Sequence, residues 1–429
     1  MSKPLDYFRY ENGVLTSEGV PLDQLARTEG TPLYVYSTEA FLRPLLALKN
    51  GLKEIDPLIC FAVKSCSNIA VLKLLGDAGA GMDIVSGGEL HRAMMAGVPP
   101  SRIVFSGVGK TDDEIKAAVA LGQGENGIRS FNVESVPELK RLSQIATGLG
   151  ARARVALRFN PDVNAKTHPY ISTGLKKNKF GLNRAEVLDV ARHLADFPGV
   201  DLQGVSIHIG SQLTSLSPLG DAYARTRKIA DELSEILPEP LPSVDLGGGL
   251  GIGYKPNQAT PSIESYCKLV LKHFKPKKGE HAYKILLEPG RIISGNAGVL
   301  LTRVLYRKKR AAKDFVIVDA AMNDLIRPAL YESHHEIVPV KKTSGRSRKV
   351  DIVGPVCETS DCLAADRPLP DKVEAGDLVA VLSAGAYGFS MASNYNSRPR
   401  TAEILVKEGR FRTIRERENY SDLIRGEHL

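Results

Sequence analysis

Eight short apolar runs, separated by amphipathic stretches between residues 56 and 290, restrict the fold of this 429-residue chain more than any other feature. Each run is rich in Val, Ile, Leu or Phe and ends near Gly, Ser, Asn or Val. In order they read "LICFAVKS", "GAGMDIVS", "RIVFSG", "GIRSFNV", "RVALRFN", "LQGVSIHIGS", "SVDLGGG" and "YKILLEPG". Such nearly continuous apolar strands are typical of a parallel sheet that helices cover on both faces.

The stretches between the runs read as helices. "NIAVLKLLGDAG" begins at a predicted Asn68 cap and ends at Gly79, and "TDDEIKAAVALG" has a Thr111 cap followed by acidic residues. Four later stretches follow the same rules: "SVPELKRLSQIATG", "NRAEVLDVARHLAD", "DAYARTRKIADELSEIL" and "SIESYCKLVLKHF". Eight strands alternating with helices over this length predict a (β/α)8 TIM barrel in the α/β class.

A doubly wound sheet is the competing interpretation. It is disfavoured because the strand count closes at eight and no GxGxxG motif follows any strand. "GVGKT" is not a phosphate-binding loop either, because Val104 occupies the position of the first glycine.

A second domain of β structure is predicted after about residue 290. The runs "GVLLTRVLYRK", "DFVIVDAA", "HEIVPV", "RKVDIVGPV" and "DLVAVLSAG" are β-branched, and "AEILVKEGRFRTI" reads as a hairpin. The opening stretch "FRYENGVLTSEGVPL" is also strand-like, with an Asn12-Gly13 turn. We therefore predict N-terminal strands in residues 1–35 that join the β domain, a barrel at 36–290 and a C-terminal β domain at 291–429.

Composition argues for a cytoplasmic enzyme rather than a membrane or nucleic-acid protein. The longest apolar runs are far shorter than the roughly 20 residues of a membrane span, and the N-terminus lacks the apolar core of a signal peptide. Five scattered cysteines without a CxxC pair suggest reduced thiols. The net charge of +8 comes from dispersed basic residues, which does not favour a nucleic-acid partner.

Polar residues and glycines stand where the predicted strands end. A single lysine there usually extends its amine to water while its stem stays buried, but a convergence of many such residues favours a site. Barrel enzymes build their active sites at the carboxyl ends of the strands. The residues concerned are Lys64, Asp83, His208, Ser211, Gly248, Gly249, Glu288, Gly290 and Arg291.

The chemistry of this set points to pyridoxal 5'-phosphate. Consecutive glycines expose backbone N–H groups that bind phosphate, and a lysine facing a phosphate-bearing aldehyde forms a Schiff base. The ring of that cofactor accepts electrons when its nitrogen is protonated, so a carboxylate such as Glu288 is wanted beside it. No His or Cys cluster has the spacing of metal ligands.

The motifs resemble those of a known family. "FAVKS", "GMDIVSGGEL", "HIGSQL", "GGGLGIGY" and "EPGR" resemble the fold-type III pyridoxal-phosphate decarboxylases. "KTHPYISTGLKKNKFG", "RPALYESHHEI", "VGPVCETSDCL" and "GAYGFSMASNYNSRPR" resemble the diaminopimelate decarboxylase branch, over nearly the whole chain. The resemblance implies decarboxylation of meso-2,6-diaminopimelate to L-lysine and carbon dioxide, by a homodimer with shared active sites.

The resemblance also implies a role for each matching residue. Lys64 would hold the cofactor as a Schiff base paired with Asp83, His208 would stack on the ring, and Glu288 would hold the ring-nitrogen proton. Cys357 and Glu358 would enter from the second subunit, with Cys357 as the proton donor. Ser211, Gly248, Gly249, Gly290, Arg291 and Tyr387 would surround the phosphate, and Arg291, Arg327, Tyr331, Glu358 and Tyr387 would bind the substrate.

The substrate assignment is also argued from charge. Diaminopimelate carries a carboxylate at its far end, which arginine recognises with two planar donors, whereas ornithine and arginine have purely cationic tails. An ornithine- or arginine-type decarboxylase, a racemase of the same fold and a non-catalytic relative that binds the cofactor remain alternatives. The chain departs from the usual motif in having Ser65 and Cys66 after the lysine. Residues 160–179 are expected to form a loop near the site, and the sequence does not decide whether it closes over the substrate.

Overall fold

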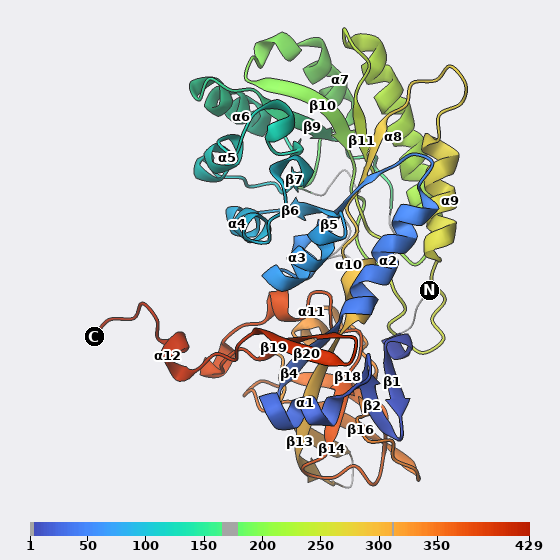
Figure 1. Ribbon diagram of the computed structural model, residues 1–429, viewed down its shortest axis with the longest axis vertical. Coiled ribbons are helices and arrows are strands. Elements are labelled where there is room, and N and C mark those ends of the chain that lie inside the picture. Colours follow the sequence, from blue (N-terminus) through green and yellow to red (C-terminus); the bar gives the residue numbers. More distant parts are fainter. Residues whose placement is uncertain (1–3, 165–178, 311–312) are drawn as a thin grey trace. The chain divides into compact units, whose positions relative to one another are not determined.

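The computed structural model describes residues 4–164, 179–310 and 313–429, and the chain divides into two compact units (Figure 1). The barrel unit contains Arg43–Gly251 and Thr260–Ile292, and the β unit contains the described residues up to Leu42, Ile252–Ala259 and Ile293–Leu429. Most of the loop expected over residues 160–179 lies outside the described residues.

The barrel unit is a closed sheet of eight parallel strands. The strand order around it is β5-β6-β7-β8-β9-β10-β11-β12, and pairing of β12 with β5 closes the ring. This confirms the predicted (β/α)8 barrel and rules out a doubly wound sheet. The strands are β5 Leu58–Ala62, β6 Gly81–Ile84, β7 Ile103–Phe105, β8 Ser130–Val133, β9 Ala153–Arg158, β10 Val200–Ser206, β11 Ser243–Asp245 and β12 Lys284–Leu287.

The helices of the barrel begin at the predicted caps. Asn68 and Thr111 accept backbone N–H groups of α3 and α5, and Thr111 with Glu114 forms a complete capping box. Sequence analysis missed α4, whose two leading glycines disfavour a helix, although Ser86 caps it. The helices are α2 Thr38–Gly51, α3 Ile69–Asp77, α4 Gly87–Met95, α5 Asp112–Val119, α6 Val136–Gly148, α7 Arg184–Arg192, α8 Ser217–Ile236, α9 Ile263–Phe274 and α10 Arg291–Ser294.

The β unit is built on a nine-stranded sheet. Its main path is β17-β16-β14-β13-β4-β19-β20, with β18 on β13 and β15 on β18. Strand β4 (Leu33–Ser37) pairs with both β13 and β19, so a strand from the N-terminal part of the chain completes this sheet. The other strands are β13 Gly298–Lys308, β14 Asp314–Val318, β15 Ile337–Pro339, β16 Ser347–Val353, β17 Cys362–Pro370, β18 Leu378–Val381, β19 Ala402–Lys407 and β20 Arg410–Arg415.

The first three strands form a small sheet of their own within the β unit. β1 (Phe8–Glu11), β2 (Val14–Ser17) and β3 (Val20–Pro21) are antiparallel, and the Leu15 N–H donates to the Val340 carbonyl. The predicted Asn12-Gly13 turn connects β1 and β2. The β unit also carries three short helices: α1 Leu22–Glu29, α11 Arg327–Tyr331 and α12 Tyr420–Leu423.

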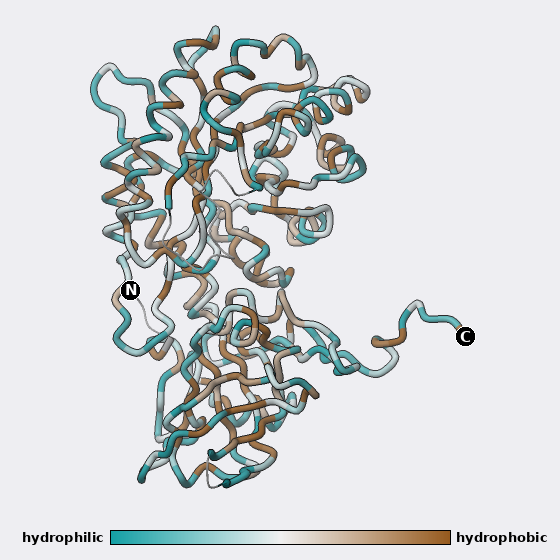
Figure 2. Tube along the Cα trace, turned by 180° about the vertical axis from the view of Figure 1, so that it is seen from behind, coloured by the Kyte–Doolittle hydropathy of each residue, from teal (hydrophilic) through white to brown (hydrophobic). Residues whose placement is uncertain are grey.

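Hydrophobic residues gather along the strands of each unit, whereas the outer loops are hydrophilic (Figure 2). In the barrel, Cys60, Val104 and Leu286 form a fully buried cluster from three different strands, with Leu58 packed against it. None of the helices in the described part of the chain has the length and apolarity needed to cross a membrane.

Truncation of this cluster should destabilise the barrel. Leu286→Ala removes buried methyl groups and leaves a cavity, so we expect a loss of roughly 2–5 kcal/mol in the free energy of unfolding. Leu149→Ala is the matched control, because Leu149 is 49% exposed and should cost little. Urea unfolding of both variants measures the difference, and equal losses would contradict the assignment of the core.

Candidate active site at the barrel rim

Lys64 lies in a single turn of 3-10 helix, Val63–Ser65, immediately after β5. Its Nζ donates to Oδ2 of Asp83 at 2.5 Å, and this aspartate of β6 is completely buried. The Lys64 side chain remains 34% exposed. Within the described residues, the other oxygen of Asp83, Oδ1, has no hydrogen-bond partner. The lysine therefore holds its amine at the strand ends against a fixed carboxylate instead of extending it to water.

Glu288 follows β12 and is buried among polar groups. Its Oε1 accepts hydrogen bonds from Asn132 Nδ2 at 3.0 Å and from Ser106 Oγ at 3.3 Å. Burial raises the pKa of Glu288 well above its usual value, and Asp245 and Asp83 raise it further against the opposing charge of Lys64. Both effects favour the protonated form of Glu288.

His208 follows β10 and is held as a neutral ring. Its Nδ1 accepts the Gly248 N–H at 3.3 Å, so the proton of the neutral imidazole resides on Nε2. Burial lowers the pKa of His208 well below its usual value, and the cations of Arg158 and Lys64 lower it further. Arg158 is itself buried in an ion pair with Glu134 and donates to the His208 carbonyl.

The glycine loop after β11 has no room for a side chain at three consecutive positions. Gly247 has φ +63°, and a Cβ there would lie 2.2 Å from the Ile207 carbonyl oxygen. A Cβ on Gly248 would lie 2.1 Å from the Glu288 carbonyl oxygen. Gly249 has φ +109° and a Cβ there would lie 2.5 Å from the Gly210 carbonyl oxygen. No acceptor in the described part of the chain takes the Gly249 N–H. The tight packing therefore leaves a backbone donor available at the rim.

Arg291 and Ser211 complete the barrel side of the site. The guanidinium Nε and Nη2 of Arg291 donate to Ser211 Oγ at 3.3 and 3.1 Å. A Cβ on Gly290 would lie 3.1 Å from the Cβ of Ala62 and 3.2 Å from that of Ser65, so this glycine lies close to the lysine turn. The barrel unit thus brings together every site residue that we predicted within it.

Three residues of this site were missed by sequence analysis: Asp245, Asn132 and Glu89. Asp245 ends β11, and its Oδ1 accepts the Gly247 N–H at 2.9 Å. Asn132 Nδ2 lies 3.4 Å from Asp245 Oδ2. Burial raises the pKa of Glu89 to about 7, although nearby Lys64 lowers it. The strand-end position of Asp245 in "SVDLGGG" was a signal that could have revealed it.

The remaining predicted residues belong to the β unit. Arg327, at the start of α11, is buried rather than part of a surface ion pair. It contacts His335 Nε2 at 2.8 Å and Ser333 Oγ at 3.2 Å, and its guanidinium lies 4.5 Å from the ring centre of Tyr254. Tyr331 ends α11, and Tyr387 has a positive φ of 56°. Both tyrosines are partly buried.

Cys357 and Glu358 are exposed in a loop that one aspartate organises. The carboxylate of Asp361 accepts the N–H groups of Met322 and Val356, both at 2.7 Å. The Cys357 N–H donates to Asn396 Oδ1 at 2.9 Å. Asp361, which sequence analysis left without a role, therefore fixes the backbone that carries the predicted proton donor.

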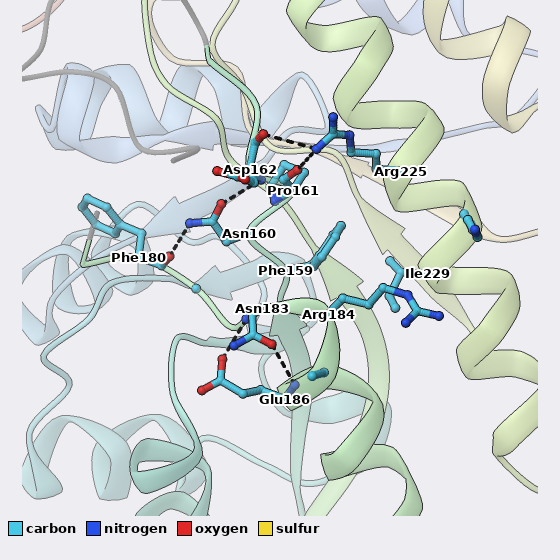
Figure 3. A pocket seen from close by; sticks show the side chains of 13 residues that line it. Phe159, Asn160, Pro161, Asp162, Phe180, Asn183, Arg184, Glu186, Arg225 and Ile229 are labelled. Carbon is cyan, nitrogen blue, oxygen red and sulfur yellow. Dashed lines mark hydrogen bonds between the residues drawn. The ribbon is translucent and has the colours of Figure 1, made fainter. Parts of the chain in front are cut away.

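A cavity of about 720 Å³ lies elsewhere on the barrel unit, between the segment after β9 and helices α7 and α8 (Figure 3). Asn160 donates to the Phe180 carbonyl at 3.0 Å, and Arg225 donates to the Pro161 carbonyl at 2.6 Å. None of the predicted cofactor residues lines it. The cavity lacks a nucleophile beside a buried carboxylate, so the chemistry favours the rim.

Residues 41–295 match the family described as "Pyridoxal-dependent decarboxylase, pyridoxal binding domain". The chain is 46% identical over 418 residues to the diaminopimelate decarboxylase of Aquifex aeolicus, covering 97% of this chain and 96% of that one. It is 48% identical over 421 residues to the Vibrio cholerae enzyme, covering 98% of each.

Solved structures agree with these relatives. The crystal structure of diaminopimelate decarboxylase from M. jannaschii in complex with L-lysine matches with a TM-score of 0.92 and 39% identity, covering 99% of this chain and 98% of that one. The Helicobacter pylori enzyme complexed with L-lysine matches with a TM-score of 0.88 and 43% identity, covering 94% and 98%.

The barrel and its lysine rim therefore define a pyridoxal-dependent decarboxylase domain, whose cofactor is pyridoxal phosphate. Identity of 46–48% over nearly the full length shows to which branch of these decarboxylases the chain belongs. The chain belongs to the diaminopimelate decarboxylase family.

Proposed function

We propose that the chain decarboxylates meso-2,6-diaminopimelate to L-lysine and carbon dioxide, the last step of lysine biosynthesis, with pyridoxal phosphate as cofactor. The observation that carries this proposal is the Lys64–Asp83 pair at the rim, beside the buried Glu288, whose pKa burial raises. It is supported by nearly full-length identity to curated diaminopimelate decarboxylases.

The residues at the rim fit the chemistry of the cofactor. One carboxylate oxygen of Asp83 accepts a hydrogen bond from Lys64, and the other has no hydrogen-bond partner in the described residues. Such an oxygen is expected beside a cofactor that binds at this place. Glu288 carries a proton that suits a basic ring nitrogen, and the Gly249 N–H with Ser211 and Arg291 suits a phosphate. When bound, pyridoxal phosphate supplies an aldehyde for an amine and a ring that accepts electrons.

Each residue then has a defined task. Lys64 would hold the cofactor covalently through its amine, Asp83 would keep that nitrogen in place, and neutral His208 would cover the ring face. Glu288 would hold the proton at the ring nitrogen. Ser211, Gly248, Gly249, Gly290, Arg291 and Tyr387 would bind the phosphate.

The substrate would be recognised by its distal amine and carboxylate. Arg327 is supported for the carboxylate because it is buried, and a buried guanidinium gains from an anionic partner. Arg291, Tyr331 and Tyr387 would contact the same molecule, and Glu358 would receive the distal ammonium. A purely cationic tail would gain nothing from these arginines.

Cys357 would return a proton to the carbon that loses carbon dioxide, and it would do so in the site of a second subunit. Its exposure, together with that of Glu358, supports a homodimer in which each loop serves the partner. We also propose that the enzyme acts in the cytoplasm, since all five cysteines are free thiols.

The substrate is tested by carbon dioxide release. We expect turnover of meso-diaminopimelate and none of L-ornithine. Arg327→Gln should lower kcat/KM by roughly tenfold to a hundredfold, because a charged hydrogen bond contributes about 1.5–3 kcal/mol. Arg303→Gln, in the same unit, is the matched control because its guanidinium donates to the Gly376 carbonyl and no catalytic role is assigned to it. Equal turnover of ornithine would refute the assignment.

The covalent role of Lys64 is tested by reduction with borohydride. We expect the cofactor mass on the peptide containing Lys64, and loss of the visible absorbance in Lys64→Ala. Lys73→Ala is the control, since Lys73 lies on the exposed face of α3 and pairs only with Asp77. A tag on another lysine would exclude Lys64 as the attachment site.

The shared site is tested by complementation. Lys64→Ala and Cys357→Ala should each be inactive alone, whereas co-expression should recover about a quarter of the activity if each site combines residues of two subunits. The reason is statistical: half of the dimers are mixed, and each mixed dimer has one intact site. Recovery should be absent if Lys64 and Cys357 act within one chain.

A further inference from the structure

Three carboxyl groups are buried together inside the barrel, but only one lysine lies among them. Asp83 on β6, Asp245 on β11 and Glu288 after β12 are 0%, 3% and 6% exposed. Lys64 bonds directly to Asp83. In the described part of the chain, no group of His, Cys, Asp and Glu is arranged to hold a metal ion. The charge of Asp245 and Glu288 therefore has to be balanced in another way.

The side chains of Asp245 and Glu288 share a hydrogen bond, which requires a proton on one of them. The other groups that contact the carboxyls of Asp245 and Glu288 are hydrogen-bond donors. Asn132 Nδ2 lies between the two, 3.0 Å from Glu288 Oε1 and 3.4 Å from Asp245 Oδ2. Gly247 N–H donates to Asp245, and Ser106 Oγ donates to Glu288. The donors satisfy both carboxyls, and the carboxyl–carboxyl contact holds the proton.

Burial raises the pKa of both carboxyls and is the largest cause of the shift in each. The hydrogen bond between them acts in opposite directions on the two, raising the pKa of Glu288 and lowering that of Asp245. Two such groups in one buried site do not both ionise. The titratable groups that face the pair are Lys64, Asp83, Cys60, Arg129, Tyr223 and Tyr266.

We propose that Asp245 and Glu288 act as one proton-sharing pair, in which Asp245 is the positioning residue that keeps a proton on Glu288 for the ring nitrogen of pyridoxal phosphate. The inference rests on the proposed function. The proton balance is complete within the site: Glu288 would give its O–H proton to the ring nitrogen and become a carboxylate, while Asp245 stays a carboxylate. The positive charge gained by the ring would offset the second carboxylate, which the buried pair alone does not allow. No further reactant is needed.

Asp245→Asn removes one negative charge with little change in shape, so the proton on Glu288 should be lost at lower pH. The first readout needs no cofactor: the infrared C=O band of protonated carboxyls in the cofactor-free full chain. The difference between the spectra of the wild type and Glu288→Gln identifies the part of this C=O band that comes from the Asp245–Glu288 pair. We expect Asp245→Asn to move its titration midpoint down by about one pH unit or more. Asp351→Asn, a buried aspartate of the β unit, should leave it unchanged.

A measurement on the unaltered chain covers the case in which Asp245→Asn does not fold. At about pH 8.5, Glu89 and Asp324 are largely ionised, because their pKa values are about 7 and about 6. The remaining band should shift on ¹³C labelling of glutamate carboxyls but not of aspartate carboxyls. A band that follows the aspartate label, or no band at all, would overturn the proposal.

The second readout uses the holoenzyme with cofactor labelled by ¹⁵N in its ring. The ring nitrogen should lose its proton at a lower pH in Asp245→Asn than in the wild type and Asp351→Asn, and Asp245→Glu should restore part of the difference. An unchanged midpoint would sink the proposal. Failure of the chain to bind the cofactor would instead refute the proposed function, while the infrared result on the free chain would still stand.

Discussion

The site depends on negative charge that the barrel buries without an equal number of cations. Closing eight strands into one sheet brings the ends of β6, β11 and β12 around a small interior, where Asp83, Asp245 and Glu288 are removed from water. Lys64 balances one of these charges, and burial raises the pKa of Glu288, which favours its neutral form. An anchored amine and an acid with a raised pKa are the two groups that pyridoxal chemistry requires.

Buried charges also affect the pKa of His208. Arg158 and Lys64 both lower its pKa, and the Gly248 N–H occupies Nδ1, so the ring is neutral and its orientation is fixed. Gly248 in turn cannot carry a side chain, because a Cβ would collide with the Glu288 carbonyl. The glycine loop, the imidazole and the acid are therefore one packed arrangement, and a change in one of them is transmitted to the other two.

Much of the fold could be predicted because its signals are local. Asn68 and Thr111 cap the helices that their sequences indicate, and the two-residue turn at Glu408-Gly409 connects β19 to β20. Helix α4 was missed because Gly87 and Gly88 have low helix propensity, and the energy of a tertiary contact outweighs it: the Gly87 N–H donates to Glu114 at 2.6 Å. Tyr254 shows what local signals cannot predict. It stands at the end of the motif "GGGLGIGY", but its ring contacts Arg327 and His335 of the β unit.

The site itself was predictable only where one residue sufficed. Lys64, Asp83 and Glu288 each stand at a strand end, a position that the sequence reveals. The importance of Asp245 is a property of a pair, because it follows from the adjacency of β11 and β12 and from Asn132 reaching both carboxyls across the barrel. No spacing along the chain encodes that three-way contact, since 113 and 156 residues separate Asn132 from its two partners. The charge coupling between Asp245 and Glu288 therefore arises only when the barrel closes. The proton that we propose this pair retains is a feature of the fold rather than of any single motif.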